Sequence, residues 1–380
     1  MNALNRLPGV LSILMLFAFP LEAQFSLSAD FTAMYDDNIN NNALQLEDRI
    51  GQLSLTAGYD WPGDHPSAQI FYSGSFSYFS RVLDRTFHDH TLGATYSSRL
   101  GGSDGRAVLS LGGTYMTRVN REYYSFYDHH QMSFHGNLQY SFSEAWTGRA
   151  GYSIRSLTLS ELPDLDYFEH YGFGQISTTL ATRTTIIAEG DIGYKVYKTG
   201  NVDTVGISPG PGGGNAVVTS SVPTVTQLTG LIRVGQAITD ATGLSITGLY
   251  QLNLQKENRY LSSVSGLISD DEVFDDRYAY EGPHGSIMLT QLIGENLLVR
   301  ASAGLQIKRY SERPAFDLAG NEVSAQRNDT RRYGTLLIQG YVETLNIVIS
   351  VQYDYIVNSS NDEFFDYANN ALTLTASLPF

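Results

Sequence analysis

The chain has no cysteine, few basic residues and no long apolar segment, and each absence excludes a class of protein. Without cysteine there is no disulfide framework, no thiol nucleophile and no cysteine-linked lipid anchor. No stretch after residue 24 approaches the roughly 20 apolar residues that a membrane-spanning helix needs, which excludes a helical inner-membrane protein. The 24 Lys and Arg are outnumbered by 39 Asp and Glu, and this net charge of −15 excludes a nucleic-acid partner.

Aromatic residues and glycine are abundant instead. The 380 residues include 25 Tyr, 18 Phe and 36 Gly. Aromatic side chains suit the pleated surface of a sheet, and glycine marks bends and bulges. A chain of this length has room for two ordinary domains, but a large β architecture can use all of it as one unit. We therefore predict a single all-β domain.

The N-terminal segment has the pattern of an export signal. Arg6 supplies positive charge, residues 10–19 form an apolar run, and Ala23 places a small residue where a signal peptidase would cleave. The alternative is a transmembrane anchor, but the apolar run has only about half the length that a spanning helix requires. We predict a signal peptide over residues 1–23 and a β domain over residues 24–380.

Strict alternation of apolar and polar residues dominates the chain from Phe25 onward. In residues 25–35 the odd positions are apolar or aromatic and most even positions are polar, which gives a strand one apolar and one wet face. Comparable runs cover residues 53–59, 70–78, 92–96, 109–115 and 132–142.

The connections between these runs alternate in length. Short turns are expected at residues 62–67, 101–105, 143–145, 181–184, 239–242, 294–296 and 344–346. Longer polar segments lie at residues 38–47, 82–87, 119–128, 159–167, 199–221, 257–277, 312–328 and 358–366. Seven short and eight long connections give sixteen strands. This arrangement predicts a transmembrane antiparallel up-and-down β-barrel with short periplasmic turns and long extracellular loops.

A soluble β-sandwich is the main alternative fold. Sandwich strands average five or six residues, whereas these runs extend to about ten to fifteen, as a tilted membrane-crossing strand requires. A soluble barrel of sixteen strands would also enclose more space than apolar side chains can fill. An inside-out barrel in lipid avoids this difficulty, and its closure satisfies every backbone donor and acceptor.

The last ten residues alternate again, with Leu372, Leu374, Ala376, Leu378 and Phe380 on one face. This segment resembles the terminal strand of bacterial outer-membrane proteins, and the chain looks like a porin-type barrel. The resemblance implies insertion into the outer membrane of a Gram-negative bacterium, among its lipid and lipopolysaccharide. It also implies that the barrel-assembly machinery recognises the last strand through Leu378 and Phe380.

Charged residues of both signs fall on the polar faces of several predicted strands. Charges around a pore orient and filter hydrated solutes, although they could also simply pair with one another and line water. A surplus of acids at the pore mouth would favour cations. The predicted pore-lining residues are Arg149, Arg155, Glu189, Asp191, Lys195, Arg300 and Lys308.

One loop has the oxygen spacing of a calcium site. Asp36, Asn38, Asn40 and Glu47 fall at ligand positions, but Asn41 stands where an EF-hand has glycine, and strands rather than helices flank the loop. An EF-hand is therefore rejected. A loosely bound divalent cation in an extracellular loop remains the only cofactor expected.

Three further groups of residues could suggest chemistry. His88, His90, His129, His130 and His135 are interpreted as lumen lining, because no compact set of other ligands completes a metal site. Ser125 and Asp128 beside His129 invite comparison with a hydrolase, but such proximity arises readily by chance, and no enzyme is predicted. The glycine-rich segment 208–215 lacks the Gly-Lys-Ser/Thr ending of a phosphate loop, so a surface loop that can fold inward is expected.

Aromatic clusters and an acidic cluster lie close to strand ends. The clusters at residues 123–127 and 364–367 are interpreted as interfacial girdles in preference to ligand-stacking surfaces. The acidic cluster comprises Asp270, Asp271, Glu272, Asp275 and Asp276, and a solvated loop explains it.

Passive diffusion of small hydrophilic solutes is the leading functional hypothesis. One alternative is an export port for a secreted polysaccharide, although no periplasmic helical-repeat module is present. The other is a surface adhesin or receptor that acts through the loops 199–221 and 257–277. A porin of this size often forms a homo-oligomer through a flat apolar wall, but no segment identifies such a wall.

Overall fold

The computed structural model describes residues 24–61, 66–102, 105–199, 201–204, 218–221, 223–257 and 277–380. Sixteen of its strands form one sheet: β1 (Gln24–Asp36), β2 (Asp48–Trp61), β3 (Ser67–Phe79), β4 (Phe87–Leu100), β5 (Ala107–Asn120), β6 (His129–Ser141), β7 (Trp146–Leu159), β8 (Tyr167–Thr179), β9 (Thr184–Tyr197), β12 (Thr224–Ala237), β13 (Thr242–Lys256), β14 (Gly282–Ile293), β15 (Leu297–Phe316), β16 (Glu322–Val342), β17 (Ile347–Ser360) and β18 (Tyr367–Pro379). Two further strands, β10 (Asn201–Thr204) and β11 (Val218–Ser221), pair only with each other.

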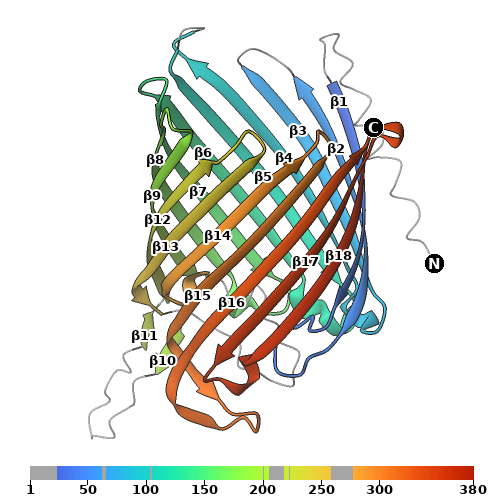
Figure 1. Cartoon of the computed structure of the whole chain (residues 1–380). Helices are drawn as coiled ribbons and strands as arrows, with labels where there is room; N and C mark the ends of the chain where they lie inside the picture. Colours follow the sequence, from blue (N-terminus) through green and yellow to red (C-terminus); the bar gives the residue numbers. More distant parts are fainter. Residues whose placement is uncertain are drawn as a thin grey trace, which may run out of the picture.

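The sheet closes on itself as a barrel (Figure 1). Each strand pairs antiparallel with its neighbours in the chain, β9 pairs with β12, and β18 returns to pair with β1 from Ser28 opposite Pro379. The backbone N–H of Phe380 donates to the carbonyl of Leu27 at 2.8 Å and extends this seam. The predicted sixteen-stranded antiparallel barrel is confirmed.

The barrel is inside out. Residues that face each other across paired strands point to the same side of a sheet, so the register carries one apolar face around the whole wall. Phe31, Leu53, Phe76 and Leu92 lie on that face and are 38–60% exposed. The opposite face, toward the lumen, is polar. An apolar exterior with a polar interior is the arrangement of a barrel in a membrane.

The two ends of the barrel differ. Tight turns close one end of the barrel, where β1 begins and β18 ends. Longer segments close the other end, as predicted (Figure 1). Short 3₁₀ helices lie at the long-loop end: η1 (Leu83–Arg85), η2 (Glu122–Tyr127), η3 (Pro163–Leu165), η4 (Arg277–Ala279) and η6 (Glu363–Phe365). A sixth, η5 (Glu343–Leu345), forms a tight turn. Within the described residues, no helix is both long and apolar enough to cross a membrane.

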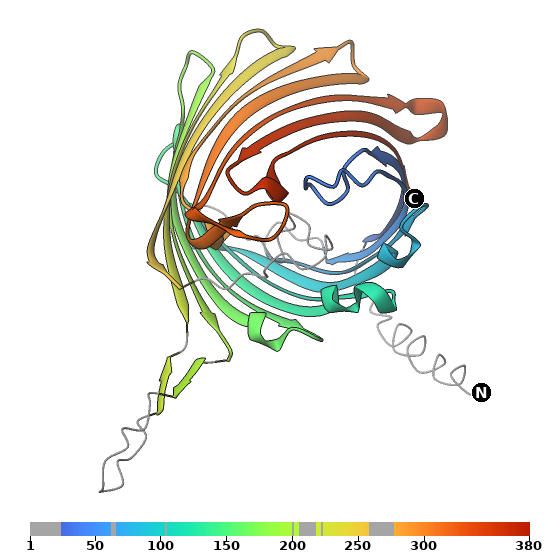
Figure 2. The same ribbon diagram turned by 90° about the horizontal axis from the view of Figure 1, so that it is seen from below.

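Several connections at the long-loop end fold over the lumen. Figure 2 shows the β1–β2 connection, η6 and the tip of the β15–β16 hairpin projecting across the barrel opening. Buried amides hold the first of these connections in place. The Asn38 side chain donates to the carbonyl of Asn42 at 2.7 Å and to that of Ala368 at 3.1 Å, and the Asn369 side chain donates to the carbonyl of Asn38 at 2.8 Å.

Apart from Tyr123, which is 62% exposed, the aromatic clusters at the loop ends pack inward and are not girdles, contrary to the sequence prediction. Tyr124 and Tyr127 are only 3% exposed and pack with Leu157, Leu159 and Tyr197 in a core at the long-loop end of the barrel. In the other cluster, Phe364, Phe365 and Tyr367 are also buried. Their apolar rings are removed from water by inward packing of the loops and not by lipid.

The predicted polar loop at residues 312–328 is mostly strand. β15 and β16 run to Phe316 and from Glu322, which makes this hairpin longer than any other in the barrel. Buried contacts support its extension: Arg327 forms an ion pair with Asp329, and its guanidinium lies 3.6 Å from the ring of Phe365. Polarity alone therefore misidentified a strand whose charges are satisfied inside the fold.

Candidate functional site

The strands β7, β8 and β9 carry six charged residues on their lumen faces. The register pairs Arg155 with Glu169, Glu169 with Lys195, and Gln175 with Glu189. Paired residues share a face, so these side chains all point into the lumen. Arg149 and Asp191 lie an even number of residues from Arg155 and Lys195 on the same strands, so they share the lumen face. The same alternation places Arg300 and Lys308 on the lumen face of β15. The role of these seven residues in permeation remains a prediction.

An inward-folded segment, residues 277–281, lies against this wall. It includes η4 and leads into β14. The side-chain amides of Gln227 and Gln251 donate to the carbonyl of Arg277 at 2.7 and 3.1 Å, and that of Asn253 donates to the carbonyl of Tyr278 at 2.9 Å. Irregular backbone has carbonyls that lack sheet partners. Three lumen-facing amides on β12 and β13 supply those partners and fix the segment inside the barrel.

Glu169 joins the segment to the charged wall. Its carboxylate forms ion pairs with Arg155 of β7 and Arg277 of the segment, and it accepts a hydrogen bond of 2.6 Å from the hydroxyl of Tyr278. Tyr278 is fully buried. Burial, and then the neighbouring Glu169 carboxylate, raise the pKa of Tyr278 well above its usual range. The phenol therefore stays protonated and keeps donating to Glu169 at physiological pH.

Gly193 provides the space that Tyr278 occupies. A Cβ atom at this position of β9 would collide with the ring and hydroxyl of Tyr278. Lys195 lies two residues further along the same face, with its ammonium 4.4 Å from the ring of Tyr167 and 4.8 Å from that of Tyr197. Such cation–π contacts hold a charge in place without neutralising it.

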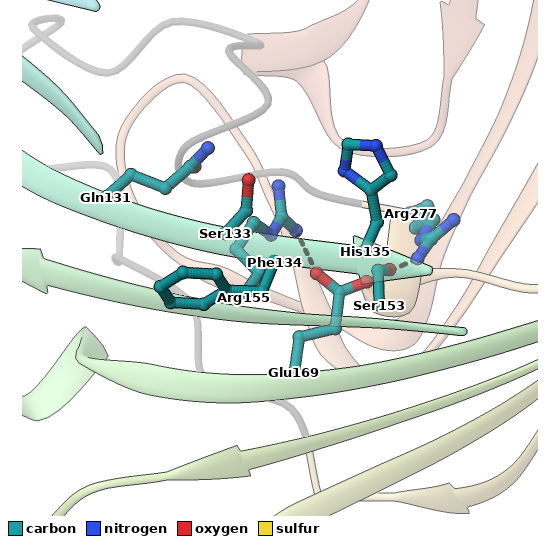
Figure 3. A pocket seen from close by; sticks show the side chains of 8 residues that line it. All are labelled: Gln131, Ser133, Phe134, His135, Ser153, Arg155, Glu169 and Arg277. Atoms are coloured by element: carbon teal, nitrogen blue, oxygen red, sulfur yellow. Dashed lines mark hydrogen bonds and ion pairs between the residues drawn. The ribbon is translucent and has the colours of Figure 1, made fainter. Parts of the chain in front are cut away.

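A cavity of about 530 Å³ opens beside these residues. Figure 3 shows Arg155 and Arg277 approaching Glu169 from two sides. Side chains of β6 and β7, among them Gln131, His135 and Ser153, complete the lining. The cavity thus combines two guanidinium groups with one carboxylate and several neutral donors and acceptors. Such a set can bind anionic and hydroxylated solutes by hydrogen bonds.

The adjoining part of the lumen wall, on β2 to β6, is lined by hydroxyl groups. They pair across strands, with Thr114 and Ser133 at 2.7 Å, Thr56 and Ser73 at 3.2 Å, and Ser97 and Ser110 at 3.3 Å. A second cavity, of about 480 Å³, lies along this wall and shares His135 with the first. Polar space therefore continues from the charged wall onto the hydroxyl wall.

The residues proposed for a divalent cation are engaged within the protein. Asp36 accepts from the side chain of Asn369 at 3.0 Å, Glu47 bonds Tyr35 and Arg81, and Asn40 bonds Arg85. Donors therefore occupy the oxygens that a metal ion would need. Among the residues that the structure describes, no group of three or more His, Asp or Glu side chains is arranged to hold a metal ion.

The histidines do not all line the lumen, so that prediction is wrong for three of them. His88 and His90 pair with Phe76 and Gly74 on the outward face of β3. His130 also faces outward, whereas His129 and His135 face inward.

The hydrolase-like set is not assembled either. Ser125 donates to the carbonyl of Glu122, His129 contacts the carbonyl of Tyr127, and Asp128 accepts from Asn120. Each of the three side chains thus hydrogen-bonds to a group outside the set, and none of these bonds joins one member of the set to another. Three other predictions, the signal peptide 1–23, the glycine-rich loop 208–215 and the acidic cluster 270–276, lie outside the described residues.

Sequence reasoning missed Glu169, Arg277 and Tyr278. Glu169 has the parity of the lumen face, and the alternation of β8 could have identified it. No local pattern marks Arg277 and Tyr278, because their position depends on amides that lie about 25 to 50 residues earlier in the chain.

Comparison with known proteins supports the fold. No family model and no curated protein matches the sequence. Among solved structures, the outer membrane protein OpdK from Pseudomonas aeruginosa superposes with a TM-score of 0.51 at 10% identity, over 95% of this chain and 100% of that chain. OpdL of Pseudomonas aeruginosa gives 0.51 at 8% identity, over 94% and 99%. The chain thus has the fold of an outer-membrane β-barrel.

Proposed function

We propose that this protein is an outer-membrane channel of a Gram-negative bacterium, through which small hydrophilic solutes and ions diffuse passively. The observation that carries the proposal is the lumen wall, which is polar from the hydroxyl wall on β2 to β6 across to the charged wall on β7 to β9. A barrel of this strand number leaves an aqueous interior unless segments fill it. The fold of the solved outer-membrane proteins agrees with this function.

The inward-folded segment 277–281 acts as the selectivity element of the proposed channel. It narrows the lumen beside the 530 Å³ cavity and adds Arg277 to a wall that already holds Arg155 and Lys195. Glu169 is the acid in contact with these two guanidinium groups. On this wall the four cations Arg149, Arg155, Lys195 and Arg277 outnumber the three acids Glu169, Glu189 and Asp191, so the proposed channel favours anions at this point despite the net charge of −15 of the whole chain.

The two barrel ends suggest the orientation. Short turns face the periplasm in outer-membrane barrels, and long loops face outward. Leu378 lies in the strand that closes the barrel, and Phe380 directly follows that strand. In this proposal the barrel-assembly machinery recognises both residues.

Planar-bilayer recording tests this proposal. Purified protein is expected to give discrete conductance steps in potassium chloride. In a salt gradient, the reversal potential should have the sign of a channel that is more permeable to anions than to cations. A protein that inserts but passes no ions would refute the channel. A strongly cation-selective current would refute the assigned selectivity element while leaving the channel intact.

A further inference from the structure

Histidine is distributed unevenly on the outward face of the barrel. His88, His90, His130 and His170 all point outward, and all lie on β4, β6 and β8. The outward positions of the other barrel strands contain no histidine within the described residues. An imidazole that faces hydrocarbon without a partner costs free energy. Because these histidines face away from the lumen, a role in lining the pore does not explain why they recur on one wall.

Each of three outward histidines is bonded to a tyrosine of the preceding strand. The hydroxyl of Tyr72 lies 2.6 Å from Nδ1 of His90, that of Tyr115 lies 2.9 Å from Nδ1 of His130, and that of Tyr152 lies 2.6 Å from Nδ1 of His170. The pairs occupy the successive hairpins β3–β4, β5–β6 and β7–β8. The same geometry therefore recurs three times; we call these three pairs the Tyr–His row.

The Tyr–His row lies near the long-loop end of the wall. His90, His130 and His170 all fall within the first four residues of their strands, directly after η1, η2 and η3. These strands have 13 or 14 residues, and about 9 to 11 suffice to cross the apolar core. The first residues of each strand therefore lie at the level of lipid headgroups.

The tyrosine orients each imidazole. When the hydroxyl donates to Nδ1, the ring proton sits on Nε2 and is directed away from the tyrosine. Nε2 of His90 lies 3.0 Å from Nδ1 of His88, whereas Nε2 of His130 and of His170 makes no hydrogen bond in the part of the chain that the structure describes. The row thus presents oriented Nε2–H donors at His130 and His170, whereas Nε2 of His90 is directed toward His88.

The surrounding wall favours a negatively charged partner. No Asp or Glu occupies an outward position on β3 to β9. Lys198 follows β9 on the same side, with its ammonium 2.5 Å from the hydroxyl of Thr158, 4.9 Å from the ring of Phe168 and 3.9 Å from the carboxylate of Asp166. On the strand wall itself, donors without interspersed acids complement phosphate oxygens.

We propose that the Tyr–His row binds the phosphate groups of a phosphorylated glycolipid in the outer leaflet. The Nε2–H groups of His130 and His170 and the ammonium of Lys198 donate to the phosphate oxygens, while Leu92 and Met132, each two residues further along its strand, contact the acyl chains. Tyr72, Tyr115 and Tyr152 are positioning residues that fix the imidazoles. This inference rests on the outer-membrane location proposed above, but it does not depend on conductance.

Native mass spectrometry of the purified full-length protein in detergent tests the proposal. The probes are lipid A with two phosphates and the same lipid after enzymatic dephosphorylation. The wild type is expected to retain the phosphorylated form selectively. The triple variant H90F/H130F/H170F should lose at least about tenfold in affinity, since hydrogen bonds to charged groups are worth roughly tenfold each. Its apolar replacements keep the wall compatible with lipid.

Two controls separate binding from folding. The matched variant L289F/L336F/V351F changes three outward residues on β14, β16 and β17, away from the Tyr–His row, and should retain the phosphorylated lipid. The variant Y72F/Y115F/Y152F keeps the imidazoles but frees their orientation, and an intermediate loss is expected, which a merely structural role for the histidines would not produce. All variants should conduct like the wild type.

Three outcomes would overturn the proposal. The first is equal retention of both lipid forms by the wild type, which would indicate acyl contacts alone. The second is unchanged binding in the triple histidine variant. The third is an equal loss in the matched control. A wild-type protein that passes no ions would instead refute the channel function, and the lipid measurement could still be interpreted.

Discussion

The two adjoining walls of the lumen are built on the same strand geometry but are lined differently. On β2 to β6 the inward positions between the strand ends carry mainly Ser, Thr and Gln, whose hydroxyls pair at 2.7 to 3.3 Å. On β7 to β9 the inward positions carry Arg155, Glu169, Glu189, Asp191 and Lys195, and the segment 277–281 packs nearby.

In the proposed channel, this contrast separates permeability from selectivity. Neutral hydroxyls exchange hydrogen bonds with any hydrated solute at little cost, because each is both a donor and an acceptor. Fixed charges discriminate between solutes, and here they are concentrated where a folded segment narrows the lumen. The net charge of −15 belongs to the whole chain and does not describe this wall.

The largest effect should come from releasing the inward-folded segment. Y278F removes a hydrogen bond to the Glu169 carboxylate, which is worth about 1.5–3 kcal/mol. The population in which residues 277–281 open should rise at least about tenfold, seen as faster amide hydrogen exchange there and as noisier single-channel current. Y96F, on the outward face of β4, is the matched control. Unchanged exchange in Y278F would show that the amides of Gln227, Gln251 and Asn253 suffice.

Removing the acid of the charged wall should have the next largest effect. E169Q leaves Arg155 and Arg277 positively charged, because a guanidinium does not deprotonate in proteins. One unit of charge at about 4 Å from an ion in water is worth about 1 kcal/mol, a factor of roughly five in relative permeability toward anions. The reversal potential in a salt gradient measures this shift. The variant Q131A, in the same cavity, should leave the potential unchanged.

Charging the hydroxyl wall should produce a smaller shift. S73K places a cation on β3, where Thr56 is the neighbouring hydroxyl. The new ammonium lies on a wall that the segment 277–281 does not contact and is screened by water and salt, so we expect anion permeability to increase only about twofold. S73D should shift the reversal potential equally in the opposite direction. A shift as large as that of E169Q would remove the distinction between the two walls.

Removing hydroxyls should have the smallest effect. The double variant T114A/S133A deletes a hydrogen-bonded pair on β5 and β6, and both sites face water. Stability should change by no more than about 0.5 kcal/mol, measured by thermal unfolding in detergent, and ion selectivity should not change. A marked change in selectivity would mean that the hydroxyl wall also filters ions.

Most of the architecture could be predicted from the sequence because alternation is a local property. The period of two assigns each strand residue to a face, and loop lengths assign each connection to an end. These signals placed Arg155, Glu189 and Lys195 on the lumen face, where the register has them.

Some histidines were assigned to the wrong face because they were judged by their polarity and not by their odd or even position along the strand. His88 and His90 share the even positions of β4 with Leu92, Ala94 and Tyr96. The same alternation that identified the strand therefore places both histidines outward. Their polarity misled because the imidazoles have partners outside the lumen: His90 bonds Tyr72, 18 residues earlier on the neighbouring strand, and His88 bonds His90.

Loop packing could not be predicted from local sequence. Whether Tyr124 or Phe365 faces lipid, water or a core depends on which segments meet above the lumen. The same holds for Tyr278, whose place requires Gly193 on β9 and Asn253 on β13. These contacts join distant parts of the chain and leave no periodic signal.

The seam between β1 and β18 has a consequence for biogenesis. The side chains of Thr32 and Thr375 meet across it at 3.1 Å although they are separated by 343 positions in the chain. Pairing at such separation carries a large loop-closure entropy and is slow. Until the last strand has emerged, β1 has an unsatisfied edge that lipid cannot tolerate. The polypeptide must therefore be kept from aggregating until it is complete, and its final strand sets the earliest moment of insertion.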